Sequence, residues 1–347
     1  MRGGWWRLLL VLPLLVVAAV LIWWRGPDWG VVQSAFSAVR WRWAVAAIGF
    51  NLLSIVARSV AWDIAIKQAL PRPRPGFPLV FSAFCVGLFA NVVLPARAGE
   101  FARVAVLARR LPRRRALWAT LVGTVFAHRV FDLFPVIALV AWVLLTAKIP
   151  QWALLSLEGF IGLGAVLLAV ALVAAHSRGR SIDDLGRVRA LLVRAREGLS
   201  VMRSPARASF AILFQSVGWT FQLLAVYTAL RAFHIHLPLV VAALVLVLMN
   251  VATVFPLWPG NVGLLQFAVA LPLVSYGVAY ARGFAFGIGL QAIEASVGVG
   301  VGLVFLAREG LSYATLKEVA GEPSDAEDAA AGEQEEPPHR ARAGVSG

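Results

Sequence analysis

The segment Asn91–Arg103, which reads NVVLPARAGEFAR, decides the fold of this 347-residue chain, because it joins an apolar stretch to a group of charges through a proline. The eighteen residues before Pro95, residues 77–94, carry no ionisable side chain except the thiol of Cys85. A spanning helix needs about 20 apolar residues to cross about 30 Å of hydrocarbon. The charges therefore begin either where a spanning helix finishes or, if the chain turns back at Pro95, inside the bilayer.

The composition is that of an integral membrane protein. Hydrophobic residues make up 60% of the chain and charged residues 14%, and the mean hydropathy is +0.79. In water, any fold of such a chain would expose a large apolar surface. Apolar runs of helical length cover residues 8–22, 43–65, 77–94, 117–147, 157–175, 209–230, 237–272 and 283–307. The chain is predicted to be an all-α polytopic membrane protein with about six full transmembrane helices.

The charge balance excludes several classes of partner. The chain carries a net charge of +14, but its last thirty residues hold eight acidic side chains against two arginines, so the rest carries +20. Most of the positive charge lies between apolar runs, which indicates membrane topology and contact with anionic lipid rather than nucleic-acid binding. The single cysteine, Cys85, cannot form an internal disulfide. We expect no cofactor, no metal and no nucleic-acid partner.

The arginine distribution favours a hairpin at Pro95. If residues 77–94 formed a full span, the basic clusters at 67–74 and 109–115 would face opposite sides of the membrane, which the positive-inside rule disfavours. A re-entrant hairpin that enters from the cytoplasm at residue 77 and returns over residues 99–111 places both clusters in the cytoplasm. The loop 176–207, with eight arginines against three acids, is then cytoplasmic and is predicted to form a basic amphipathic helix on the inner leaflet.

The second half of the chain repeats this pattern in the opposite orientation. The long apolar run 237–272 is broken by Pro256, Pro259, Gly260 and Gly263, and Pro259 precedes Gly263 by the spacing that separates Pro95 from Gly99. The halves 43–147 and 208–307 thus predict an inverted repeat with two opposed re-entrant helical hairpins, an arrangement found in transporters that bind substrate near the midplane. The alternative is that both prolines only kink ordinary spanning helices.

The predicted domain organisation and location follow from this topology. Residues 1–310 form one transmembrane domain, and residues 311–347 form an acidic, disordered cytoplasmic tail. We expect a multi-pass protein of the bacterial inner membrane, with both termini in the cytoplasm.

Ionisable side chains within the membrane are costly and therefore mark candidate sites. Arg97, Glu100 and Arg103 follow at three-residue spacing on one helical face, so Glu100 can bridge both arginines and leave one net positive charge. The free N–H groups of a half-helix that starts after Pro95 would add to the attraction for an anion. This segment is predicted to contact an anionic group.

Further polar groups lie in the other long apolar runs. Asp132 can reach His128 and Arg129 within one helix, and Arg58 shares a helical face with polar neighbours. Glu294 is either a proton or cation relay or a counter-ion for Arg58 or Arg129. The candidate substrate-binding residues are Arg97, Glu100, Arg103, Arg58, Arg129, Asp132, Asn91 and Glu294, with no catalytic residue assigned.

These motifs resemble a known family. The pattern Asn91-x3-Pro95-x-Arg97-x-Gly99-Glu100-x2-Arg103, the pair Arg129 and Asp132, and the second proline–glycine break at 256–263 are similar to the flippase-like transmembrane region of lysylphosphatidylglycerol synthases and their stand-alone relatives. The resemblance covers residues 8–307. Family members usually have Pro-Gly-Gly-x-Gly followed by a glutamate at the second hairpin, whereas this chain has Asn261 and Gln266 there.

The resemblance implies movement of an anionic lipid or lipid-linked headgroup between leaflets. We do not expect aminoacyl transfer by this chain, because only about forty residues follow the membrane region, and this acidic segment, rich in Ala, Gly, Pro and Glu, is too short and too polar for the synthase domain. One alternative is a membrane enzyme that acts on a lipid phosphate with Glu100 or Asp132 as base. Another is a non-transporting partner of a separate lipid-modifying enzyme, bound through the basic loop or the acidic tail. The sequence does not define the oligomeric state.

Overall fold

The computed structural model describes residues 27–70, 74–94, 99–111, 114–148, 204–254 and 263–310, with isolated positions between 155 and 201 and at 261. The predicted helix 8–22, most of the runs 157–175 and 176–207, and the tail 311–347 lie outside the described residues. The same holds for Pro95, Arg97, Pro256, Pro259 and Gly260.

Every element of the described ranges is a helix, which confirms the predicted all-α class. In chain order they are α2 (Trp29–Ser37), α3 (Trp41–Ala69), α4 (Phe77–Val93), α5 (Gly99–Arg109), α6 (Arg114–Thr146), α9 (Pro205–Ala232), α10 (Leu239–Val254), α11 (Leu264–Val274) and α12 (Tyr280–Arg308). Four of them, α3, α6, α9 and α12, are long and apolar enough to cross a membrane, whereas α4, α10 and α11 are shorter apolar helices.

The long helices extend past the apolar runs predicted from the sequence. Residues 43–65, for example, become the 29-residue α3, and residues 209–230 become the 28-residue α9. Arginine and lysine can continue a helix at its ends because their long side chains reach the polar interface while their stems stay apolar.

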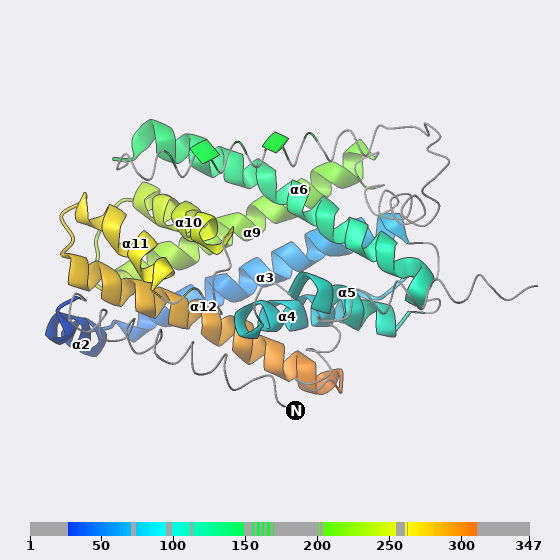
Figure 1. Cartoon of the computed structure of the whole chain (residues 1–347), viewed down its shortest axis with the longest axis horizontal. Helices are drawn as coiled ribbons and strands as arrows, with labels where there is room; N and C mark the ends of the chain where they lie inside the picture. The colour runs from blue at the N-terminus through cyan, green and yellow to red at the C-terminus, as the bar shows by residue number, and fades with distance from the viewer. Residues whose placement is uncertain are drawn as a thin grey trace, which may run out of the picture.

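The same order of helix lengths occurs twice along the chain. Helices α3, α4, α5 and α6 contain 29, 17, 11 and 33 residues, and α9, α10, α11 and α12 contain 28, 16, 11 and 29. Helices α3 and α9 lie antiparallel in the middle of the bundle, since Arg40 donates a backbone hydrogen bond of 3.0 Å to Ala232 at one end and Ala65 packs beside Ala211 near the other (Figure 1).

Helices α4 and α5 pack against each other as an antiparallel pair. Where the chain passes from α4 to α5, the amide oxygen of Asn91 accepts a 3.0 Å hydrogen bond from the backbone N–H of Gly99. At the other end, the carboxylate of Glu309 accepts hydrogen bonds from Ser82, at 2.7 Å, and from Arg110, at 3.1 Å. The two arms predicted for the first hairpin are therefore neighbours, and its re-entry into a membrane stays a prediction.

Helices α10 and α11 form a second short pair at the opposite end of the bundle. The side chain of Asn261, which lies between the two helices in the sequence, donates a 3.1 Å hydrogen bond to the carbonyl of Ala252 near the end of α10. The hydroxyl of Tyr276, just after α11, accepts a 2.7 Å hydrogen bond from the N–H of Lys148, just after α6. Each pair has an end that lies away from its connecting segment, and we call it the open end. The open end of the second pair lies near the start of α12, and that of the first pair lies near the end of α12 (Figure 1).

Both short pairs reach the middle of α12. A Cβ atom at Gly287 would lie 3.0 Å from Cα of Gln266 in α11, and a Cβ atom at Gly298 would lie 3.2 Å from Cγ2 of Val92 in α4. Glycine thus allows close helix contact at both places. Glu294 lies between the two contacts, which are about 16 Å apart along the helix at 1.5 Å per residue. The middle of α12 therefore lies between the two short pairs, and Glu294 is part of it.

Candidate functional site

Asp132 is the centre of a polar cluster built from three long helices. Its Oδ1 atom accepts hydrogen bonds from Trp219 Nε1 at 2.7 Å, from Arg58 Nη2 at 3.3 Å and from the side-chain amide of Gln215. Its Oδ2 atom accepts from Arg129 Nη1 at 3.1 Å. Because Asp132 is buried, these donors are what make a carboxylate tolerable inside the bundle.

The cluster continues into the first short helix pair. Arg129 forms ion pairs with both Asp132 and Glu100, and Glu100 also binds Arg103 one turn along α5. Glu100 therefore joins α5 to α6. The three-residue spacing of Glu100 and Arg103 places both groups on the α5 face that contacts the bundle.

Arg103 is the most deeply placed cation of the cluster, with 4% of its surface exposed. Its guanidinium lies 4.7 Å from the centre of the Trp62 ring and 5.5 Å from that of Phe84. The Trp62 indole donates a 3.2 Å hydrogen bond to Thr124, which fixes the ring in place. Aromatic faces attract a cation and present no donor that would compete for its counter-ion. Arg103 is thus held at a defined place by α3 and α4.

Arg58 crosses from α3 to α9 at a glycine. A Cβ atom at Gly218 would lie 2.5 Å from Cγ and 3.2 Å from Cδ of Arg58, so the arginine stem passes where another residue would place its side chain. Beyond this point the guanidinium lies 3.4 Å from the side-chain oxygen of Gln222 and 5.8 Å from the centre of the Trp219 ring. Arg58 can therefore take this position only because residue 218 has no side chain.

Glu294 connects α12 to the same cluster. It is a hydrogen-bond neighbour of Gln222 and lies within electrostatic reach of Arg58. One turn earlier on α12, Gln291 pairs with Gln266 of α11, whose side-chain oxygen accepts a 2.6 Å hydrogen bond from the N–H of Gly263. Polar side chains thus run from the second short pair, through α12, to the arginines beside the first.

Several buried polar atoms of this cluster have no hydrogen-bond partner in the part of the chain that the structure describes. They include Nε of Arg58, Nε of Arg103 and Oε1 of Gln215. Buried guanidinium donors normally find acceptors, and guanidinium groups bind phosphate and carboxylate well. Three arginines and three carboxylates make the cluster close to neutral, yet it keeps unused donors. This arrangement can bind an anionic group.

The comparison with protein families agrees with this architecture. Residues 10–302 match the model of the lysylphosphatidylglycerol synthase TM region. The chain belongs to this family. It is also similar to the UPF0104 membrane protein MJ1078 of Methanocaldococcus jannaschii, with 25% identity over 203 residues that cover 57% of this chain and 84% of that protein. No solved structure matches the chain.

Membership in the lysylphosphatidylglycerol synthase TM region family identifies a membrane-spanning protein with several apolar helices. It is consistent with a role that concerns membrane lipid. Among the described residues, no three side chains of His, Cys, Asp or Glu group as metal ligands would.

The structure brings together most of the residues selected from the sequence of this family member. Arg58, Glu100, Arg103, Arg129, Asp132 and Glu294 lie in one connected cluster. The side chain of Asn91 bonds the backbone of Gly99, next to Glu100, and so holds α4 to the start of α5. Of the predicted hairpin breaks, Gly99 is the first residue of α5, and Gly263 directly precedes α11 with a φ of 93°.

Sequence reasoning missed the contribution of α9. Gln215, Trp219 and Gln222 all reach the cluster, and none was a candidate. They occur at positions i, i+4 and i+7, so they share one face of a helix whose other residues are mostly apolar. That polar stripe within a membrane-length run was the available signal.

Proposed function

We propose that this protein moves an anionic lipid, or a lipid-linked headgroup, between the two leaflets of the membrane. Arg58, Arg103 and Arg129 bind the phosphate during its passage, together with Arg97, which lies outside the described residues. The observation that carries this proposal is the convergence of three arginines from α3, α5 and α6 in the middle of the bundle. Among the residues that the structure describes, the Nε donors of Arg58 and Arg103 meet no acceptor.

Electrostatics explain why such a cluster would serve transport. A charged headgroup in the hydrocarbon core loses its hydration, and guanidinium groups restore part of that interaction through paired hydrogen bonds. Glu100, Asp132 and Glu294 keep the arginines compensated while no phosphate is bound, so that the bundle does not hold several bare cations. A phosphate that enters would replace carboxylates as the partner of the arginines. Arg129, whose side chain is 38% exposed, is the accessible member of the three.

The same proposal includes the topology predicted from the sequence. The pairs α4–α5 and α10–α11 are re-entrant hairpins that enter from opposite faces of a bacterial inner membrane, with both chain termini in the cytoplasm. Two copies of one helix order, with α3 antiparallel to α9, support an inverted repeat. In such a repeat the facing hairpin ends can alternate between two arrangements, which would open the cluster to either leaflet in turn.

Leaflet exchange in reconstituted vesicles tests the proposal. Purified protein is placed in vesicles with phosphatidylglycerol that carries a fluorophore on one acyl chain, and an impermeant reductant quenches the outer leaflet over time. We expect wild-type protein to speed the exposure of inner-leaflet probe. Arg97→Ala, Arg58→Gln and Arg103→Gln should slow it by about tenfold or more, since a hydrogen bond to a charged group is worth about 1.5–3 kcal/mol.

The matched control is Arg308→Gln, which removes an exposed arginine at the end of α12 and should leave exchange unchanged. Equal rates for wild type and Arg103→Gln would contradict the proposal. Release of phosphate or of a headgroup from the lipid would favour a membrane enzyme in its place. Co-purification with a lipid-modifying enzyme, in the absence of exchange, would favour a non-transporting partner.

A further inference from the structure

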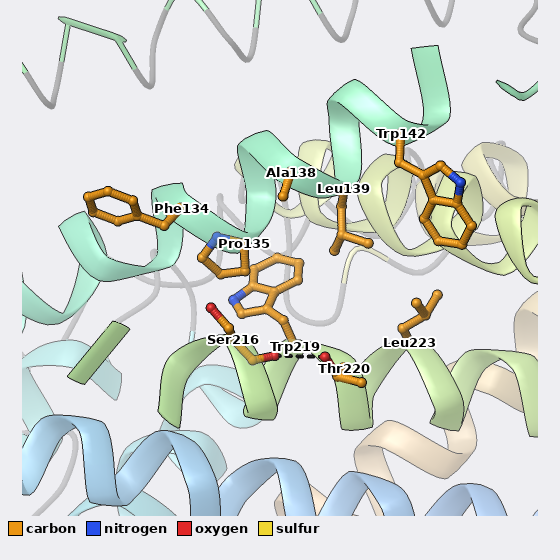
Figure 2. Close-up of a pocket in the computed structure, with 9 residues that line it drawn as sticks. All are labelled: Phe134, Pro135, Ala138, Leu139, Trp142, Ser216, Trp219, Thr220 and Leu223. Carbon is orange, nitrogen blue, oxygen red and sulfur yellow. Dashed lines mark hydrogen bonds between the residues drawn. The ribbon is translucent and has the colours of Figure 1, made fainter. Parts of the chain in front are cut away.

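An apolar groove lies between α6 and α9, directly beside the charged cluster. It has a volume of about 450 Å³, which is within the usual range for small-molecule sites. Figure 2 shows its two walls. The lining residues are Phe134, Pro135, Ala138, Leu139 and Trp142 from α6, and Ser216, Trp219, Thr220 and Leu223 from α9.

Local chemistry accounts for the shape of the groove. Pro135 lies inside α6 and has no N–H to donate to the carbonyl of Phe131, so the helix cannot keep its regular hydrogen bonding at this point. On α9, the hydroxyl of Thr220 donates a 2.9 Å hydrogen bond to the carbonyl of Ser216 and so turns its polar atom toward its own helix (Figure 2). The groove therefore has mainly apolar walls and suits a hydrocarbon occupant.

Trp219 belongs both to the groove and to the charged cluster. Its ring forms part of the groove wall, and its Nε1–H donates the 2.7 Å hydrogen bond to Asp132. Asp132 also precedes the first lining residue, Phe134, by only two positions in α6. One end of the apolar groove thus adjoins the arginine cluster. This is the order of parts in a phospholipid, which has a phosphate at one end and hydrocarbon chains attached close to it.

The groove runs from the cluster toward one end of the bundle. Its lining on α6 extends from residue 134 to residue 142, about 12 Å at 1.5 Å per residue, in the direction of Thr146. On α9 it runs in the direction of Ala232. The chain therefore runs in the same direction along both walls of the groove, away from the arginines.

We infer that the groove between α6 and α9 holds one acyl chain of a phospholipid whose phosphate is bound by Arg58 and Arg129. This inference rests on the proposed function, because it names the substrate as a diacyl phospholipid rather than a free anion. Its first consequence is that the protein keeps hold of one chain while the headgroup is at the arginines. Its second is that the groove selects for a hydrocarbon chain that is joined to the phosphate through a short linker such as glycerol.

Photo-labelling with matched lipids tests the inference. Wild-type protein in nanodiscs is mixed with phosphatidic acid that carries a diazirine on one acyl chain, or with the diacylglycerol that has the same chain and no phosphate. After irradiation, labelled peptides are mapped by mass spectrometry. We expect the phosphatidic acid probe, and not the diacylglycerol probe, to label residues 134–142 and 216–223 above the level of the exposed helix surfaces.

A filled groove should lose this labelling. Ala138→Trp places an indole in the groove, whereas Ala141→Trp, three residues further along α6, places it on an exposed surface outside the groove. We expect Ala138→Trp to reduce labelling of residues 216–223 to the level of the diacylglycerol probe and Ala141→Trp to leave it unchanged. Both variants should show the elution profile and unfolding midpoint of the wild type, which separates a blocked groove from a misfolded protein.

Two results would overturn the inference. One is equal labelling by the two probes, which would mean ordinary contact with surrounding lipid. The other is a disulfide between cysteines placed at position 138 and within residues 157–175, which would assign the groove to the chain itself. Neither result depends on leaflet exchange. Leaflet exchange without phosphate-dependent labelling would support the proposed function and contradict the acyl-chain site. Phosphate-dependent labelling without leaflet exchange would support the acyl-chain site and contradict the proposed function.

Discussion

Arg58 on α3 and Asp132 on α6 lie 3.3 Å apart, between Nη2 and Oδ1, in the interior of the bundle. They are 74 positions apart in the sequence, and Asp132 simultaneously binds Arg129 and two side chains of α9. One carboxylate therefore holds three long helices together. The stability of the bundle and the position of its arginines depend on the same group.

Asp132→Asn is expected to destabilise the protein. The substitution leaves Arg58 and Arg129 without the charge that compensates them in a buried site, a change that costs about 3–5 kcal/mol for buried pairs. Unfolding in mixed detergent micelles measures the loss. Asp63→Asn is the control, since Asp63 is also buried but pairs with Lys67, whose half-exposed ammonium can turn to water, so the loss should be smaller. Similar losses for both variants would contradict a central role for Asp132.

Gly218→Ala is expected to displace Arg58 more than it destabilises the fold. The added Cβ would lie 2.5 Å from Cγ of Arg58, and an arginine stem can turn away from such a contact. Leaflet exchange should therefore fall strongly while the unfolding midpoint falls little. Gly300→Ala on α12 meets no atom within 4 Å and serves as the control for exchange. Normal exchange by Gly218→Ala would show that Arg58 is not needed in this position.

Gly87→Ala is expected to separate α4 from α5. Its Cβ would lie 2.8 Å from the backbone oxygen of Gly99 and 2.9 Å from Cβ of Arg103, and neither atom can swing away. Overpacking of this kind costs about 1–3 kcal/mol. Gly49→Ala, which meets nothing within 4 Å in α3, should be neutral or stabilising because alanine favours helix. Thermal unfolding in detergent would detect the difference, and equal midpoints would refute the close packing.

Glu309→Gln is expected to loosen the open end of the α4–α5 pair. The Glu309 carboxylate binds Ser82 of α4 and Arg110 at the end of α5, and the neutral amide would lose the charge that holds Arg110. Amide hydrogen exchange at the start of α4 and at the end of α5 should become faster, and that at the centre of α3 should not change. Arg308→Ala is the neighbouring control. If exchange did not rise, the pair would be held by apolar contacts alone.

Cysteine labelling in intact cells should place the open ends of the two short pairs on opposite sides of the membrane. Arg74→Cys and Arg110→Cys, in a Cys85→Ser background, are expected to react from the cytoplasm only. Lys148→Cys, which adjoins Tyr276 at the other end, is expected to react with an impermeant maleimide from outside. Opposite sides for positions 74 and 110 would contradict re-entry of the first hairpin.

Several features of the fold could be predicted from the sequence because they depend on local chemistry. Apolar runs of membrane length must form helices to satisfy their backbone groups. The predicted break at Pro95 falls between α4 and α5, and the ends of both helices lie within a few residues of the predicted ones. Arg97, Glu100 and Arg103 were recognised by their cost in an apolar environment. The helix ends were less predictable, since flanking arginines continue α6 and α9 beyond their apolar runs.

The sequence by itself determined the class of protein, the helices and the charged residues that required explanation, since hydropathy and proline act on neighbouring positions. Only the tertiary structure decided the partners of those charges. Asp132 could have paired within α6 alone, but the packing of α3 against α9 gives it Arg58, Gln215 and Trp219 as well. Glu294 was left between two roles, and its position beside Gln222 places it at the arginine cluster. Such pairings depend on which helices become neighbours, which is a property of the whole bundle.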